Sequence, residues 1–137
     1  MAYLLDTDMC IYMINRRPGY EGILGRIGGL RYGDVLLSTI TLAELRYGVA
    51  KSGHRERNRD RLERFLARFE ERDFDAGASR AYGSVRAQLE AAGTPIGPLD
   101  TLLAAHALSL GAVMVTHNVR EFSRVTGLAL ENWVAAP

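Results

Sequence analysis

Three carboxylates occupy positions from which a folded chain of alternating strands and helices would bring them together. Asp6 follows the apolar run 3–5, and Glu44 follows the apolar run 35–37. Asp100 opens a helix made almost wholly of Leu and Ala. Two carboxylates about 4 Å apart repel each other by roughly 4 kcal/mol at an effective dielectric near 20. Because such a cluster persists only when protons or a cation neutralise it, these residues indicate a divalent-metal site.

Asn118 is a fourth candidate, since it directly follows the strand-like run 113–116. In an open parallel sheet, ligands bind in the crevice beyond the carboxyl ends of the strands. Asp6 and Glu44 also follow strands, and Asp100 begins the helix that leads into the run 113–116. We therefore expect all four side chains to line one crevice.

Glu44 and Asp100 also have purely structural interpretations. The pattern Thr41-Leu42-Ala43-Glu44 is typical of a capping box, in which Glu44 would bond to the amide of Thr41. Taken alone, this pattern favours the capping role for Glu44. Asp100 is a good helix N-cap, although the loop 93–98 before it is more elaborate than a cap requires.

Asp6 and Asn118 could likewise serve either as helix caps or as site residues. An acid after a strand often caps the next helix, but Thr7 or Asp8 can do that here, which leaves Asp6 free for chemistry. Asn118 is as well suited to cap a short helix at 119–125 as to take part in a site. No single position decides between the two roles.

Short apolar runs alternate with helical patterns along the chain. This alternation predicts an α/β protein whose parallel sheet is covered on both faces. The expected strands are 3–5, 35–38, a short one at Phe74, 113–116 and an edge strand at 128–133, and the expected helices are 7–15, 20–27, 42–50, 56–71, 76–92, 100–110 and 119–125.

Composition sets further bounds. The 137 residues, with 47% hydrophobic and 24% charged residues, suit a single globular domain over 1–137. The net charge of +1 means that any affinity for nucleic acid must come from a local patch. The lone Cys10 excludes an internal disulfide and a thiolate zinc cage, and it fits a reducing cytoplasm. With no apolar run near the roughly 18 residues of a membrane span, we expect a cytoplasmic protein without membrane contact.

Two other groups of residues could contribute to function. His106 lies among Ala and Leu and is expected to be a hydrogen-bonded core histidine, whereas His117, beside Asn118, could approach phosphate or water. The basic stretch 51–64 contains one Lys and five Arg diluted by acids. It fits a solvated helix face with local ion pairs, or contact with an RNA backbone. No nucleic-acid-binding residue is assigned from the sequence.

Four segments in order along the chain resemble the PIN domain, and more narrowly the VapC-type ribonuclease toxins of VapBC toxin–antitoxin modules. The resemblance covers essentially the whole chain. The segments are Leu4-Leu5-Asp6-Thr7-Asp8, then 38–48 (STITLAELRYG), then 100–107 (DTLLAAHA), and finally 115–122 (VTHNVREF).

The resemblance implies a three-layer α/β/α fold with a central, mostly parallel sheet, and a metal-dependent endoribonuclease that uses Mg²⁺ or Mn²⁺. Asp6, Glu44 and Asp100 match the family's principal acidic positions, which implies that they hold the metal. Asn118 stands where many members have a fourth Asp, so a second, tightly held metal is not implied. The implied partners are an RNA substrate such as tRNA, a cognate VapB-type antitoxin and a homodimer mate.

Under this hypothesis, Asp6 and Asp100 hold Mg²⁺, Glu44 orients the attacking water or accepts its proton, and Asn118 fixes that water. The products would carry 5′-phosphate and 3′-hydroxyl ends. Phosphoryl-transfer folds with clustered acids need a Lys at a strand end, and the single Lys51 ends a helix instead. A non-catalytic module whose acidic cleft receives a basic partner peptide is the remaining alternative.

Overall fold

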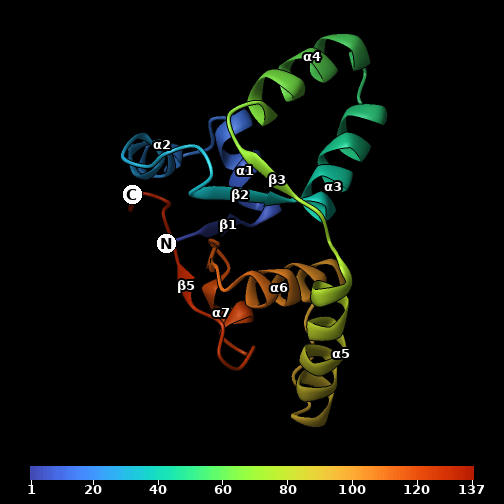
Figure 1. Cartoon of the computed structure of the whole chain (residues 1–137). Coiled ribbons are helices and arrows are strands. Elements are labelled where there is room, and N and C mark those ends of the chain that lie inside the picture. Colours follow the sequence, from blue (N-terminus) through green and yellow to red (C-terminus); the bar gives the residue numbers. More distant parts are fainter.

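The computed structural model describes residues 1–137 and contains one five-stranded sheet. The strand order is β3-β2-β1-β4-β5, and every neighbouring pair is parallel (Figure 1). This confirms the predicted α/β architecture with a parallel sheet. The strands are β1 (Tyr3–Leu5), β2 (Val35–Ser38), β3 (Glu70–Arg72), β4 (Val113–Val115) and β5 (Leu130–Glu131).

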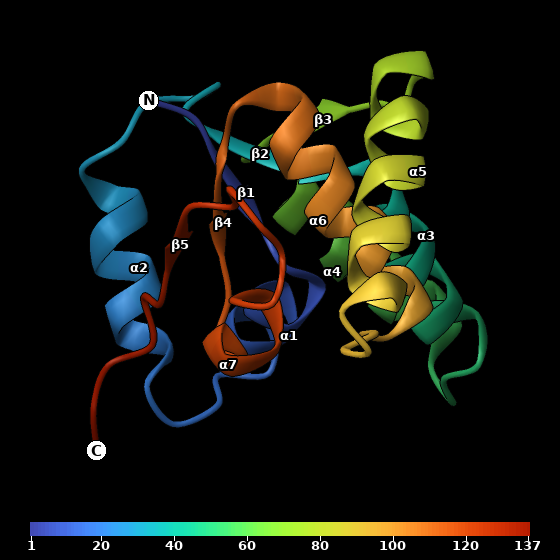
Figure 2. The ribbon, with the colours of Figure 1, turned by 90° about the horizontal axis from the view of Figure 1, so that it is seen from below.

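Helices cover both faces of the sheet, as Figures 1 and 2 show. On one face lie α1 (Thr7–Ile14), α2 (Tyr20–Gly28), α3 (Thr39–Ala50) and α4 (Arg55–Leu66). On the other lie α5 (Ala76–Ala91), α6 (Pro98–Leu110) and α7 (Val119–Phe122). The three-layer arrangement is therefore confirmed. None of these helices combines the length and the apolar character needed to cross a membrane.

Alternate residues of the central strands belong to two separate hydrophobic cores, because successive side chains of a strand point to opposite faces. Leu5, Leu37 and Val115 belong to the core under α1–α4. Leu4, Leu36 and Met114 belong to the core under α5–α7. All six are buried, which explains why these strands read as continuous apolar runs rather than alternating ones.

The strand order reverses direction between β1 and β4. From β1 the chain adds β2 and then β3 on one side of the sheet, and then returns to place β4 and β5 on the other. Such a switch point opens a crevice at the carboxyl ends of the two strands. Asp6 follows β1 and Thr116 follows β4, so both residues lie at this crevice.

The helix expected at 56–71 is two elements. Helix α4 ends at Leu66, and Glu70–Arg72 forms β3, which pairs with β2. Charged residues are common on edge strands, so this strand carries no apolar signal. The strand expected at Phe74 is wrong, because the Phe74 amide donates to Thr39 Oγ1 (3.1 Å) outside the sheet.

Several helix starts also differ from expectation. Helix α3 begins at Thr39, because Ser38 Oγ accepts the Ile40 amide and acts as its N-cap. The capping-box interpretation of Glu44 is therefore wrong. Helix α6 begins at Pro98, which is suited to the first helical position, so Asp100 lies in the first turn rather than at the N-cap.

Gly22 of α2 lets the C-terminal segment pack against that helix. A Cβ at Gly22 would collide with Trp133 O and lie 2.7 Å from Ala135 N. A Cβ at Gly25, in the same helix, would meet nothing within 4 Å. Substitution of Gly22 by Ala therefore tests both packing and helix propensity, whereas substitution of Gly25 tests helix propensity alone.

We expect Gly22→Ala to lower the free energy of unfolding by about 1–3 kcal/mol, because the backbone of the C-terminal segment must shift. Gly25→Ala is the matched control and should raise it by roughly 0.5–1 kcal/mol through helix propensity. Urea unfolding of both variants measures the difference. Equal stability of the two variants would contradict this packing role.

Candidate metal centre

Asp6 is a buried carboxylate at the end of β1, 6% exposed. Its amide still donates to Val115 O (2.9 Å), which ties it to β4, and its backbone is extended at the N-cap of α1. It makes no side-chain cap bond. Instead, Thr116 Oγ1 donates to Asp6 Oδ2 (2.9 Å), and the Asn118 amide donates to Thr116 Oγ1 (2.9 Å). The carboxylate is therefore oriented by the segment after β4.

The surroundings of Asp6 disfavour its charge. Its pKa is raised from 3.8 to about 6. Burial is the main cause and the charges of Asp8 and Glu44 contribute, while hydrogen bonds from Thr116 and the Asp8 amide oppose the change. A cation placed beside this carboxylate would restore the ionised form.

Glu44 is held by a hydroxyl chain from α1. Thr7 Oγ1 donates to Glu44 Oε1 (2.7 Å), and Thr7 Oγ1 also lies 2.9 Å from Thr41 Oγ1. Because a hydroxyl has one proton, Thr41 is the donor of the second bond. Glu44 is half-buried in the interior of α3, so its carboxylate is positioned beside the α1 N-terminus instead of capping its own helix.

Asp100 adds a third carboxylate from the first turn of α6. Its pKa is raised from 3.8 to about 7, first by burial and then by repulsion from Asp6, Glu121 and Glu44. Glu121 also lies within hydrogen-bonding reach of Asp100, and its Oε1 accepts the Gly97 amide (3.1 Å). The structure thus brings the three predicted acids within electrostatic reach of one another.

Asn118 occupies the N-cap position of α7 but makes no side-chain cap bond. Its Nδ2 donates to Glu121 Oε2. The amide therefore orients Glu121, and its own carbonyl oxygen is the atom available for a metal or a water. That Asn118 takes part in the site stays a prediction.

The donor set is made of carboxylate and amide oxygens, the ligands that Mg²⁺ and Mn²⁺ prefer. No group of three or more His, Cys, Asp or Glu side chains is arranged so that it could hold a metal ion by itself. Mg²⁺ does not need one, because it keeps several waters and is held by one or two carboxylates. The residues fit an open site with Asp6 and Asp100 as ligands, and direct ligation by Glu44 stays a prediction.

Glu121 and two hydroxyls were not found from the sequence. Glu121 falls in the site because one turn of α7 brings it back beside Asn118, a spacing that an i, i+3 search around Asn118 would have detected. Thr7 and Thr116 orient Glu44 and Asp6. Each directly follows or lies near a strand end, but nothing in its residue type marks it as functional.

The remaining titratable candidates lie outside the centre. His106 is buried, as expected; Ser38 Oγ accepts the Ile40 amide and lies 2.8 Å from His106 Nδ1. Burial lowers the pKa of His106, and its Nε2 has no hydrogen-bond partner.

His117 is exposed, and its Nδ1 lies 3.3 Å from Asn132 Nδ2. Burial raises the pKa of the Cys10 thiol far above its usual range, so this thiol stays protonated.

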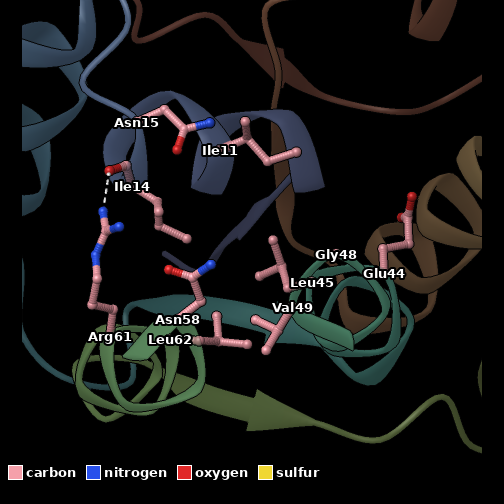
Figure 3. A pocket seen from close by; sticks show the side chains of 10 residues that line it. All are labelled: Ile11, Ile14, Asn15, Glu44, Leu45, Gly48, Val49, Asn58, Arg61 and Leu62. Carbon is pink, nitrogen blue, oxygen red and sulfur yellow. Dashed lines mark hydrogen bonds between the residues drawn. The ribbon is translucent and has the colours of Figure 1, made fainter. Parts of the chain in front are cut away.

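A cavity of about 290 Å³ begins at Glu44 and runs between α1, α3 and α4. Figure 3 shows Glu44 at one end of its lining and Arg61 at the other, where Arg61 Nη2 donates to Ile14 O (3.3 Å). We call this cavity the α1–α4 groove. Its apolar wall consists of Ile11, Ile14, Leu45, Val49 and Leu62.

Comparison with known proteins places these features in context. The family model of the PIN domain matches residues 3–128. The chain is 43% identical over 134 residues to Ribonuclease VapC2 of Rickettsia felis, covering 97% of this chain and 98% of that protein. It is 41% identical over 133 residues to the tRNA(fMet)-specific endonuclease VapC of Shigella flexneri, covering 97% and 98%.

A solved structure shows the same likeness in three dimensions. The crystal structure of DNA-bound VapBC from Salmonella typhimurium superposes with a TM-score of 0.90 at 43% identity, covering 97% of this chain and 98% of that one. The likeness in fold thus extends over nearly the whole chain.

The raised pKa values predict how stability depends on pH. Both carboxyls bind more protons in the folded than in the unfolded state between pH about 4 and 7, so stability should fall as pH rises through this range. For Asp6, the change from 3.8 to about 6 corresponds to roughly 3 kcal/mol. We expect Asp6→Asn to be more stable than the wild type at pH 8 and to lose less stability between pH 5 and 8.

Urea unfolding in EDTA at the two pH values measures this effect. Asp60→Asn, which removes an exposed carboxylate of α4 that forms no ion pair, is the control and should keep the wild-type pH dependence. An unchanged pH dependence in Asp6→Asn would show that the Asp6 charge is not destabilising.

Proposed function

The chain belongs to the PIN domain family and, within it, to the VapC ribonucleases of toxin–antitoxin systems, and from this premise we propose that it is a Mg²⁺-dependent endoribonuclease toxin. The observation that carries the proposal is the carboxylate cluster at the β1/β4 switch point. Asp6 and Asp100 both have pKa values raised by burial and by neighbouring acids. Such a cluster is suited to a divalent cation and, through it, to a phosphodiester.

Asp6 and Asp100 would hold Mg²⁺, or Mn²⁺ in its place. When bound, the ion supplies a bound water of lowered pKa and stabilises negative charge on the phosphoryl oxygens. Thr116 keeps Asp6 oriented through its hydrogen bond of 2.9 Å. Asp6 is buried and Asp100 is half-buried, so the ion would lie partly shielded from bulk water.

Glu44, Glu121 and Asn118 would act on the attacking water. Glu44 is half-buried, and Thr7 holds one of its oxygens, so the other oxygen is available to orient water or accept its proton. Glu121 is fixed by the Gly97 amide and by Asn118. Attack by water on phosphorus, with cleavage of the bond from phosphorus to the 3′-oxygen and protonation of that oxygen, would give products with 5′-phosphate and 3′-hydroxyl ends.

RNA is the proposed substrate class, and tRNA is the first candidate within it. The Shigella flexneri relative is named a tRNA(fMet)-specific endonuclease, and the Rickettsia felis relative is named a ribonuclease. Cleavage mapping on total cellular RNA, with the wild type beside Asp6→Ala and with and without Mg²⁺, identifies the target.

A cognate VapB-type antitoxin is the proposed partner, since the Salmonella typhimurium structure is named as a VapBC complex. The α1–α4 groove suits it, because its apolar wall can receive an amphipathic helix or peptide. A basic side chain of that segment would reach Glu44, which lines one end of the groove. Self-association into a homodimer stays a prediction.

Asp100→Asn tests the metal role. We expect it to lower RNA cleavage by at least about 10²-fold, because a neutral amide binds Mg²⁺ far less well than a carboxylate does. Cleavage of total RNA followed by end-group analysis measures this, and wild-type products should carry 5′-phosphates.

A second readout does not depend on activity. Millimolar Mg²⁺ should raise the unfolding temperature of the wild type, since a ligand that binds only the folded state stabilises it, and should raise that of Asp100→Asn much less. Retained cleavage in the variant would remove the metal role. Absence of Mg²⁺-dependent cleavage in the wild type would favour the non-catalytic module that receives a basic peptide.

The groove predicts a separate effect on the antitoxin. Val49→Asp places a charge on the apolar wall, and we expect it to weaken capture of the co-expressed antitoxin by roughly 10-fold or more. Ala87→Asp, on the exposed face of α5 across the sheet, is the matched control and should leave capture unchanged. Co-purification measures both variants, and equal capture would exclude the groove as the antitoxin site.

A further inference from the structure

Four exposed arginines surround one hollow on the surface of α1 and α4. The hollow has a volume of about 400 Å³, and its other lining residues are Met13, Ile14 and Phe65. No carboxylate lines it. We call Arg16, Arg61, Arg64 and Arg68 the arginine cluster.

The cluster follows from the sequence pattern of α4. Positions 61, 64 and 68 are three and four residues apart, which places them on one face of a helix, and Arg68 continues that spacing just past the helix end at Leu66. Arg16 comes from the turn after α1 and has a positive φ of 48°. A residue with a side chain rarely adopts this conformation, and here it stands beside three other cations.

The arginines of the cluster have no acidic partner. The ion pairs of the structure involve Arg17, Arg26, Arg46, Arg72 and Arg86 instead. The one ion pair of α4 joins Glu63 to Arg46 of α3. Like charges at this spacing destabilise a helix, so a bound anion would stabilise this face. The sequence-based interpretation of stretch 51–64 as a face with local ion pairs is therefore wrong for this part of it.

The hollow adjoins the α1–α4 groove at the hydrogen bond from Arg61 Nη2 to Ile14 O. Ile14 and Arg61 line both, and the groove reaches Glu44 at its other end. A chain that lies across the carboxylate centre and follows the groove would therefore arrive at the arginine cluster. Figure 3 shows this path from Glu44 past Leu45 and Asn58 to Arg61.

We propose that the arginine cluster binds the phosphate backbone of single-stranded RNA that extends along the groove from the carboxylate centre. This rests on the proposed ribonuclease function and adds residues that position its substrate. Guanidinium groups match phosphate with paired N–H donors, and contacts to the backbone suit any sequence. An acidic peptide is the competing ligand. Along the groove, such a peptide would be repelled by Glu44, whereas an RNA phosphate at the carboxylate centre would be accompanied by a neutralising cation.

The test compares two double variants of equal charge. Arg64→Gln/Arg68→Gln removes two members of the cluster whose side chains make no hydrogen bond within the protein and no ion pair. Arg55→Gln/Arg59→Gln removes two exposed arginines that line a different hollow, beside Arg46. Both are made in the Asp100→Asn background, and binding of a fluorescein-labelled single-stranded RNA is measured by anisotropy in EDTA between about 50 and 200 mM salt.

We expect the cluster variant to bind RNA roughly 5- to 20-fold more weakly at about 50 mM salt, and the slope of log affinity against log salt to become shallower by about 1.4. The control variant should keep the parental affinity and slope. In the background with Asp100 intact, the cluster variant should raise KM for RNA with little change in kcat.

Each other outcome is decisive. The proposal is overturned if RNA affinity falls equally in both double variants or falls in neither. It is also overturned if Arg64→Gln/Arg68→Gln binds RNA normally but no longer captures the antitoxin. Weaker RNA binding in the cluster variant alone, combined with a wild type that cleaves no RNA, supports the cluster while refuting the proposed ribonuclease function. Thermal unfolding of both variants verifies that they are folded.

Discussion

The repulsion between carboxylates at the β1/β4 switch point is the constraint on which the site depends. Asp6 follows β1 and Asp100 lies in the first turn of α6, and the charge of Asp6 helps to raise the pKa of Asp100. Folding therefore creates a site in which ionisation of the two carboxyls is shifted from acidic pH to about pH 6–7. The hydrogen bond from the Thr116 hydroxyl opposes this shift, because it stabilises the ionised form of Asp6. A divalent cation is the simplest species that satisfies both carboxylates at once.

The rest of the fold holds these mutually repelling carboxylates in place. The three central strands are buried on both faces by two independent cores, so their ends cannot move apart without loss of packing. The Asp6 amide stays bonded to Val115 O, which fixes the carboxylate relative to β4. Glu44 is reached from α1 through Thr7 and Thr41. Asp6 is thus held by the segment at the end of β4, and Glu44 by Thr7 of α1.

The sequence predicted the elements whose signals are local. The strands at Tyr3–Leu5 and Val35–Ser38 are apolar runs, and Asp75 is an ordinary N-cap whose Oδ1 accepts the Ala78 amide. The sequence did not predict β3, because Glu70–Arg72 is charged and becomes a strand only by pairing with β2. The capping box at Thr41 failed for a similar reason, since Ser38 offered an earlier cap. Glu121 was overlooked because it enters the site only through the turn of α7.

The net charge of +1 conceals two surfaces of opposite sign. The carboxylate centre alone repels RNA, because phosphates approach unneutralised acids. A cation removes that repulsion at the scissile bond, but it contributes little along the rest of a strand. Affinity over that length must come from fixed positive charge elsewhere. The four arginines at the far end of the α1–α4 groove provide it, and because that groove also suits the antitoxin, one bound protein segment would cover the acids and the path of the RNA together.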